Sequence, residues 1–377
     1  MLLSISRSLL KIPRPRDLAV AALGTLLATA AALCGAQAPP TSEPAEAAPA
    51  ASSNVPAPAR YDIALVLPLD APAYARAADA VRAGFMAAAE AAGAASRCIV
   101  IGHGADSVIA AFDAARDKGV SVIVGPLVRD DLKTIAIAGG DWPVTIALNQ
   151  LDDGSALPPN MYSLALAVES DARVLARRAW ADGARKVDVV EGDGALVHRL
   201  AGAFAAEWIA QGGAAPDVFD VEPSRESLTD LRKSLLRATP DAVLLAVDVQ
   251  NAALVKPFLP NVAVYASSLV FERPLAAAAH DLDDIRIVEI PWILTPDAPE
   301  LALLPRREYG GPALNRLYAL GLDAFRVAHV FLAGTPRAFD MEGAIGHLTL
   351  DERHQFQRDG RMGIYRDGQV VPLDGPR

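Results

Sequence analysis

The sequence has few of the residues that usually build metal centres or disulfide frameworks. Its 377 residues include two cysteines and six histidines. The histidines are scattered, without an HxxxH or CxxC pattern, so we expect no zinc site of the usual kind and no other cofactor. After Cys34, Cys98 is the only cysteine left, and one cysteine cannot form an intramolecular disulfide. Its place in a predicted strand at 97–101 favours burial as a small apolar side chain.

The patterns that accompany catalysis are also missing. The chain contains no GxSxG nucleophile elbow. The segment 192–194 (Gly-Asp-Gly) follows a predicted strand, but Val197 stands where a dinucleotide loop has its third glycine, so a plain turn is favoured. His103 lies on a loop without an acidic partner at ligand spacing. The acidic pairs are adjacent in sequence and point apart, which favours solvated faces: Asp130-Asp131, Asp152-Asp153 and Asp283-Asp284. The sequence predicts a protein that is not an enzyme.

The balance of charge excludes two classes of partner. The formal net charge is −10, although the first 36 residues are basic, so the rest of the chain is strongly acidic. An acidic surface repels nucleic acid and anionic lipid headgroups. We therefore expect no nucleic-acid partner, and contact with a membrane only through a lipid anchor.

The N-terminus has the pattern of an export signal. Basic residues up to Arg16 precede an apolar run at 18–33, which is short for a membrane span. Small residues at 34–36 allow a cut before Gln37, so we predict a signal peptide over 1–36 and a periplasmic protein. Lipidation of Cys34 and anchoring in the outer membrane is the alternative, with the bulky Leu33 in front of it, and both outcomes stay open. Residues 37–60 are rich in proline and alanine and predict an extended linker.

From residue 61 onward the chain alternates strands and helices. A continuous apolar run at 63–67 leads through a loop at Asp70 into an alanine-rich helix at 73–92, as in the first strand of a parallel sheet. Further strand–helix units predict a parallel, doubly wound sheet, and a second series of such units starts at a strand over 162–165. Asp367-Gly368 near the C-terminus is typical of a hairpin turn.

Two series of strands and helices predict two lobes with a central cleft. Lobe 1 would comprise 61–160 plus 292–340, and lobe 2 would comprise 161–291 plus 341–377. Ligands bind such sheets at the carboxyl ends of the strands, and Arg129 near a helix start could bind a carboxylate. The cleft candidates that follow predicted strands are Asp70, Leu127, Val128, Arg129, Asn149 and Gln150 in lobe 1, and Asp193, Asp248 and Ser267 in lobe 2.

Several motifs occur in an order that resembles a known family. IALVLPLDAP at 63–72, VSVIVGPLVRDDLKTIA at 120–136, ALNQ at 147–150 and LYALGLDAFRVA at 317–328 are similar to the LppC/LpoA family of penicillin-binding protein activators. The likeness covers about residues 61–373. It implies a fold like that of type I periplasmic binding proteins. It also implies an envelope protein that activates a bifunctional penicillin-binding protein, a peptidoglycan synthase, by protein–protein contact.

Two other functions stay open. The main alternative is the substrate-binding protein of an ABC uptake system for a small polar or amino-acid-like solute. Solute-binding relatives usually hold amino acids with hydroxyl groups after the first and third strands, whereas residues 69–71 and 126–128 contain no serine or threonine. A third hypothesis is an amidase-like enzyme with a site that the sequence does not reveal.

Overall fold

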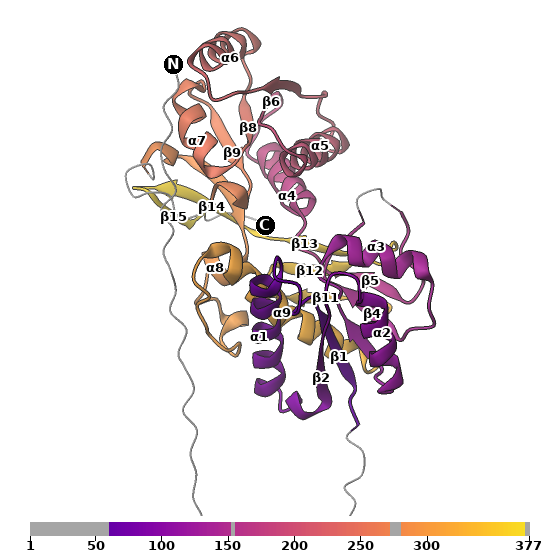
Figure 1. Cartoon of the computed structure of the whole chain (residues 1–377). Coiled ribbons are helices and arrows are strands. Elements are labelled where there is room, and N and C mark those ends of the chain that lie inside the picture. Colours follow the sequence, from indigo (N-terminus) through magenta and orange to yellow (C-terminus); the bar gives the residue numbers. More distant parts are fainter. Residues whose placement is uncertain (1–59, 152–154, 272–279, 374–377) are drawn as a thin grey trace, which may run out of the picture. The chain divides into compact units, whose positions relative to one another are not determined.

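The computed structural model describes residues 60–151, 155–271 and 280–373. The predicted signal peptide with Cys34, the predicted linker up to residue 59 and the pair Asp152-Asp153 lie outside these residues. The described chain forms two sheets covered by helices and a small third sheet (Figure 1).

The first sheet is parallel, with its strands in the order β2-β1-β3-β4-β5. All residues of β1 are buried because helices cover both faces of the sheet. Alternate side chains enter two cores: Ile63, Leu65 and Leu67 one, Ala64 and Val66 the other. The strands are β1 (Ile63–Leu67), β2 (Cys98–Gly102), β3 (Val122–Val124), β4 (Val144–Ala147) and β5 (Met161–Ser163).

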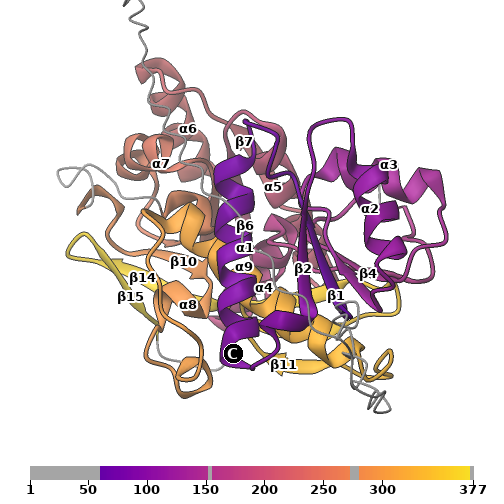
Figure 2. The same cartoon turned by 60° about the horizontal axis from the view of Figure 1, so that its bottom comes forward.

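Helices pack on both faces of this sheet (Figure 2). On one face lie α2 (Val108–Asp117) and α3 (Arg129–Ala138), with Phe112 and Leu132 in the core. On the other face lie α1 (Ala75–Ala91) and α9 (Pro312–Phe331). The continuous apolar strands of the sequence are therefore explained by burial on both sides, and the predicted doubly wound sheet is confirmed.

Helices α1 and α9 pack closely because each has a glycine at the contact. A Cβ on Gly84 would lie 2.0 Å from the carbonyl oxygen of Tyr318, and one on Gly321 would lie 2.1 Å from that of Val81. No side chain fits at such a distance, so the two backbones touch directly. An edge-to-face pair of Phe85 and Phe325, with 5.4 Å between the ring centroids, extends the contact.

The second sheet has the strand order β15-β14-β10-β9-β8-β6-β7. Its parallel strands are β6 (Val187–Glu191), β7 (Asp217–Asp220), β8 (Ala242–Ala246), β9 (Ala263–Ala266) and β10 (Ile285–Glu289). One face is covered by α4 (Val168–Ala181) and α5 (Ala195–Ala210), and the other by α6 (Arg225–Ala238) and α7 (Val249–Val255).

An antiparallel hairpin completes the edge of the second sheet. It consists of β14 (Arg361–Arg366), which pairs with β10, and β15 (Gln369–Pro372). The turn residues Asp367 and Gly368 have φ values of 50° and 71°. Positive φ at both central residues is the requirement of a type I′ turn, so the hairpin predicted from Asp-Gly is confirmed.

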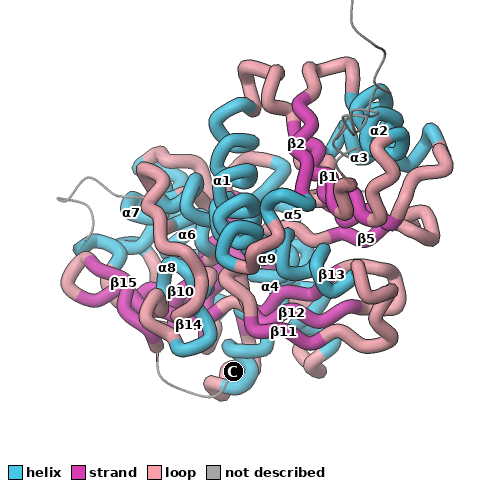
Figure 3. The backbone as a smooth tube through the Cα atoms, turned by 90° about the horizontal axis from the view of Figure 1, so that it is seen from below, coloured by secondary structure: helices cyan, strands magenta, loops and turns pink. Residues whose placement is uncertain are grey.

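Two elements differ from the predicted assignment to lobes. The sequence placed residues 161–163 in lobe 2, but β5 pairs with β4 in the first sheet. The sequence also placed residues from 341 onward in lobe 2. Instead, β11 (Asp340–Glu342), β12 (His347–Leu350) and β13 (Phe356–Asp359) form a third sheet that lies next to α9 (Figure 3). Leu348 and Phe356 of this sheet belong to the core of the first sheet. Aromatic contacts explain this placement, since Tyr162 and Phe356 both pack on Phe331 of α9.

The chain crosses between the sheets after β5, after β10 and between β13 and β14. The sheets belong to one compact unit, and the division into two lobes remains a prediction. The short helices are α8 (Pro291–Leu294) and the 3-10 turns η1 (Ala95–Arg97), η2 (Lys256–Phe258), η3 (Ser268–Val270), η4 (His280–Leu282) and η5 (Pro299–Leu301). None of the helices in the described ranges has the length and apolar character that a membrane span needs.

Candidate functional site

Four of the predicted cleft residues are joined by hydrogen bonds around Asn149. Its amide nitrogen donates to the carbonyl oxygen of Leu127 at 2.9 Å. Its amide oxygen accepts from the backbone N–H of Gln150 at 2.9 Å and from Nε of Arg129 at 3.4 Å. Ser163 on β5 donates to the Asn149 carbonyl at 2.8 Å. Asn149 therefore holds together the loops that follow β3 and β4. Val128, the N-cap residue of α3, lies beside them in the chain.

Asp70 and His103 lie together at the carboxyl ends of β1 and β2. The backbone N–H of Asp70 donates to the His103 carbonyl at 3.2 Å, and the Asp70 side chain is exposed. The His103 imidazole is buried, with Nδ1 at 2.8 Å from the Gly104 carbonyl oxygen. The Nδ1 atom is therefore the protonated nitrogen that donates this bond.

The structure corrects two predictions about this region. The sequence showed no acidic partner for His103 and treated Asp131 as part of a solvated face. Asp131 is 8% exposed, and its Oδ2 lies 4.0 Å from Nε2 of His103. Burial raises the pKa of Asp131, and nearby His103 opposes this rise. The two residues follow β2 and β3, which flank β1, so the sheet order brings them together.

The candidates from the second sheet lie at the ends of three neighbouring strands, β6, β8 and β9. Asp248 is the N-cap of α7 and accepts from the Asn251 backbone N–H at 2.8 Å. Ser267 is buried and accepts from the Leu269 N–H at 3.3 Å. Asp193 is exposed in the turn before α5. Capping explains the first two residue types without a ligand. That these nine residues line a ligand-binding cleft remains a prediction.

Buried ion pairs connect the core of the first sheet to elements of the second sheet. The sequence did not predict them. Arg358 on β13 pairs with Asp171 on α4, and their side chains are 3% and 5% exposed. Arg316 on α9 binds Glu289 at the end of β10 through Nη2 at 2.5 Å and Nε at 3.1 Å. The same guanidinium donates to the carbonyls of Ser268 and Phe271 at 3.1 and 3.0 Å. These bonds fasten the first core to α4 and to the loop after β9.

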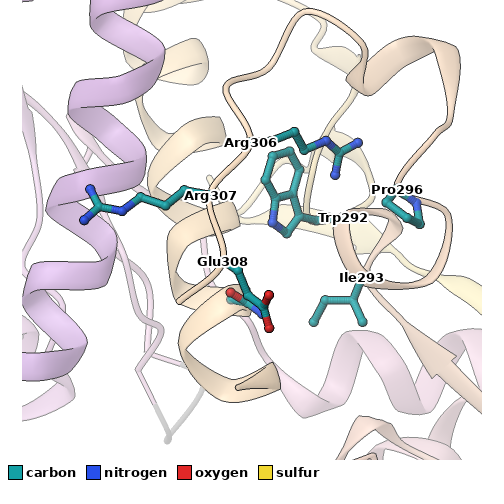
Figure 4. Close-up of a pocket in the computed structure, with 7 residues that line it drawn as sticks. Trp292, Ile293, Pro296, Arg306, Arg307 and Glu308 are labelled. Carbon is teal, nitrogen blue, oxygen red and sulfur yellow. The ribbon is translucent and has the colours of Figure 1, made fainter. Parts of the chain in front are cut away.

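A pocket of about 470 Å³ lies elsewhere, where α8 meets the segment before α9 (Figure 4). No motif in the sequence predicted a site in this region. The pocket is lined by Trp292, Ile293, Pro296, Arg306, Arg307, Glu308 and Asn315. We call it the Trp292 pocket.

Solved structures define the class of the fold. One described as "a putative branched-chain amino acid ABC transporter" from Chromobacterium violaceum has a TM-score of 0.70 and 34% identity, over 81% of this chain and 99% of that one. The LpoA C-domain from Haemophilus influenzae, described as a regulator of PBP1A, has a TM-score of 0.72 and 24% identity, over 83% of this chain and 100% of that one. The chain has the type I periplasmic-binding-protein-like fold, as predicted.

Sequence comparison then identifies the family. The family described as "LppC putative lipoprotein" matches residues 54–368, so the chain belongs to the LppC family. A curated relative, the penicillin-binding protein activator LpoA of Haemophilus influenzae, is 27% identical over 277 residues, which cover 69% of this chain and 46% of that protein. The chain spans about half the length of the curated relatives it matches.

Proposed function

We propose that this chain is a non-catalytic protein of the cell envelope that activates a bifunctional penicillin-binding protein by direct contact. The observation that carries the proposal is the family match over residues 54–368. Relatives from Haemophilus influenzae and Edwardsiella ictaluri are named penicillin-binding protein activators. The solved LpoA C-domain from Haemophilus influenzae shares the fold of this chain.

Buried contacts fasten the segments through which the chain crosses between the two sheets. Asp171 lies on α4, just after the crossing that follows β5, and its partner Arg358 lies on β13, just before the crossing to β14. Glu289, at the third crossing, is held by Arg316. These contacts hold the crossing segments in place, and a preorganised surface favours recognition by a partner.

The test is reconstitution with a purified bifunctional penicillin-binding protein from the same organism. Residues 37–377 should raise its rate of glycan polymerisation or of cross-linking, and the rise should saturate with added protein. A monofunctional glycosyltransferase is the control and should not respond. An unchanged rate of the bifunctional enzyme at saturating protein would refute the proposal.

The second candidate is the substrate-binding protein of an uptake system for a small polar or amino-acid-like solute. It is favoured by the likeness to the Chromobacterium violaceum structure, and the nine predicted cleft residues would form its site, with Arg129 binding a carboxylate. Thermal-shift screening with amino acids separates the candidates. A bound solute adds about 2.7 kcal/mol of stability at a hundredfold excess over Kd, whereas the regulator should show no shift.

The location of the protein also belongs to the proposal. We propose a periplasmic protein, either released after cleavage at residue 36 or anchored in the outer membrane through Cys34. Labelling cells with radioactive palmitate decides between these outcomes. The anchored form should carry label that a Cys34→Ala variant lacks.

A further inference from the structure

An aromatic stack with an arginine at each end begins at Trp292, in the wall of the Trp292 pocket. Tyr318 lies between Trp292 and Tyr309, with ring centroids 5.7 and 5.6 Å apart. The guanidinium of Arg306 lies 4.1 Å from the Trp292 ring centroid, and that of Arg307 lies 4.9 Å from the Tyr309 centroid. Figure 4 shows Arg306 over the indole, while Arg307 extends away from it. Each cation is held in place by an aromatic face.

The segment that carries the two arginines is also tied down along its length. The backbone N–H of Tyr309 donates to Oδ1 of Asn315 at 2.6 Å, and the Tyr318 hydroxyl donates to the Pro305 carbonyl at 2.9 Å. At its start, Glu300 forms an ion pair with Arg361 of β14. A surface that is already rigid loses little conformational entropy when a partner binds.

This rigid segment presents two arginines that pack on aromatic rings and one exposed leucine. Within the described residues, neither Arg306 nor Arg307 takes part in an ion pair. Leu303, three residues before Arg306, is 92% exposed. Arginine, tryptophan and tyrosine are also the residue types that dominate binding energy at protein interfaces.

The geometry favours an acidic peptide over a sugar. A sugar ring would need an open aromatic face, but Trp292 is only 6% exposed because Arg306 and Tyr318 cover it. Glu308 also lines the pocket, so its two arginines leave a net positive charge. In a chain with a net charge of −10, this local positive charge would orient an acidic partner that the rest of the surface repels.

We propose that the Trp292 pocket and Leu303 form a docking surface for an acidic segment of a partner protein. A carboxylate of the partner pairs with Arg306, and an adjacent apolar side chain packs on Leu303. The inference rests on the proposed function, since the partner would be the bifunctional penicillin-binding protein.

The test measures the affinity of residues 37–377 for that purified enzyme. Arg306→Glu and Leu303→Asp should each weaken Kd at least tenfold, as expected for central interface residues. Matched controls are Arg232→Glu on α6 and Ile137→Asp on α3, an aliphatic residue that is 86% exposed. Both controls should bind within twofold of the unchanged protein. The Leu303, Arg232 and Ile137 variants should keep the melting temperature of the unchanged protein, because none of these residues belongs to a core. Arg306→Glu loses its contact with the Trp292 ring, so Arg306→Gln, which loses the same contact without reversing the charge, is its stability control. Added salt should weaken binding of the unchanged protein to the enzyme more than it weakens binding of the Arg306→Gln variant.

Three results would overturn the docking surface. If the unchanged protein binds and activates the enzyme and the two pocket variants do so equally well, the surface is wrong while the proposed function stands. If the unchanged protein does not bind the enzyme at all, the proposed function fails and the surface with it. If the pocket variants lose binding to purified glycan strands but keep binding to the enzyme, the occupant is a sugar polymer.

Discussion

Removing Asp171 should destabilise the protein more than removing any exposed acid. The Asp171→Ala substitution leaves the guanidinium of Arg358 buried, with 3% of its side chain exposed. The neutral oxygens that remain near it are the carbonyls of Ile345 at 3.3 Å and Ala167 at 3.4 Å. Both distances are long for charge-assisted hydrogen bonds, so they do not replace the lost carboxylate.

The expected magnitude follows from this burial. Breaking a buried pair by removing one partner costs about 3–5 kcal/mol, because the other charge stays without compensation. Asp171 also accepts from the Ser268 hydroxyl at 3.2 Å, and losing that bond adds about 1 kcal/mol. We expect the free energy of unfolding to fall by about 4–6 kcal/mol, a large part of the 5–15 kcal/mol typical of folded domains.

Urea unfolding followed by circular dichroism measures the effect. The control is Asp230→Ala, which removes the acid of an exposed pair with Lys233 whose side chains are 64% and 59% exposed. Exposed pairs contribute about 0–1 kcal/mol. A double variant, Asp171→Leu with Arg358→Met, should recover most of the stability because no charge stays buried. A loss below about 1 kcal/mol in Asp171→Ala would refute the reasoning.

Further predictions concern packing, pH dependence and the reactivity of Cys98. Gly321→Val should lower the free energy of unfolding by about 3 kcal/mol or more, since the new side chain would collide with the Val81 carbonyl. The control is Gly202→Ala on α5, where a Cβ meets nothing within 4 Å. This variant should raise the free energy of unfolding by about 0.5–1 kcal/mol. Burial raises the pKa of Cys98 from 9.0 to about 11. The folded protein favours the neutral thiol, so stability should fall as pH rises from 9.0 to about 11, and Cys98→Ala should remove this loss in urea unfolding measured at each pH. Alkylation of Cys98 at pH 8 should be slow until urea is added, and fast labelling of the folded protein would contradict its burial.

Local sequence patterns predicted much of the fold. The run at 63–67 has a continuous apolar pattern because β1 is covered on both faces, and a pattern of this kind is visible without the structure. Asp367-Gly368 predicted its hairpin because few other residues adopt the positive φ values that the turn needs. The assignment of β5 and of β11 to β13 was wrong because it depends on aromatic contacts with Phe331, which come from distant parts of the chain.

The sequence likewise predicted some contacts in the candidate sites and missed others. Strand-end positions predicted that Leu127, Arg129, Asn149 and Gln150 would lie together, because the carboxyl ends of parallel strands share one edge. The sequence missed the contact of His103 with Asp131, since it depends on β2 and β3 flanking β1. It also missed the Trp292 pocket, because four of its lining residues, Pro296 and Arg306 to Glu308, come from irregular segments without any periodic pattern.

The sequence by itself determined the elements, their parallel arrangement and the tight turn near the C-terminus, because propensity and burial pattern act within a few residues. Only the tertiary structure decided which charges are buried. Asp171 and Arg358 are 187 residues apart in the chain, and each alone would be costly to bury. Their pairing becomes possible only once α4 and β13 have packed against each other.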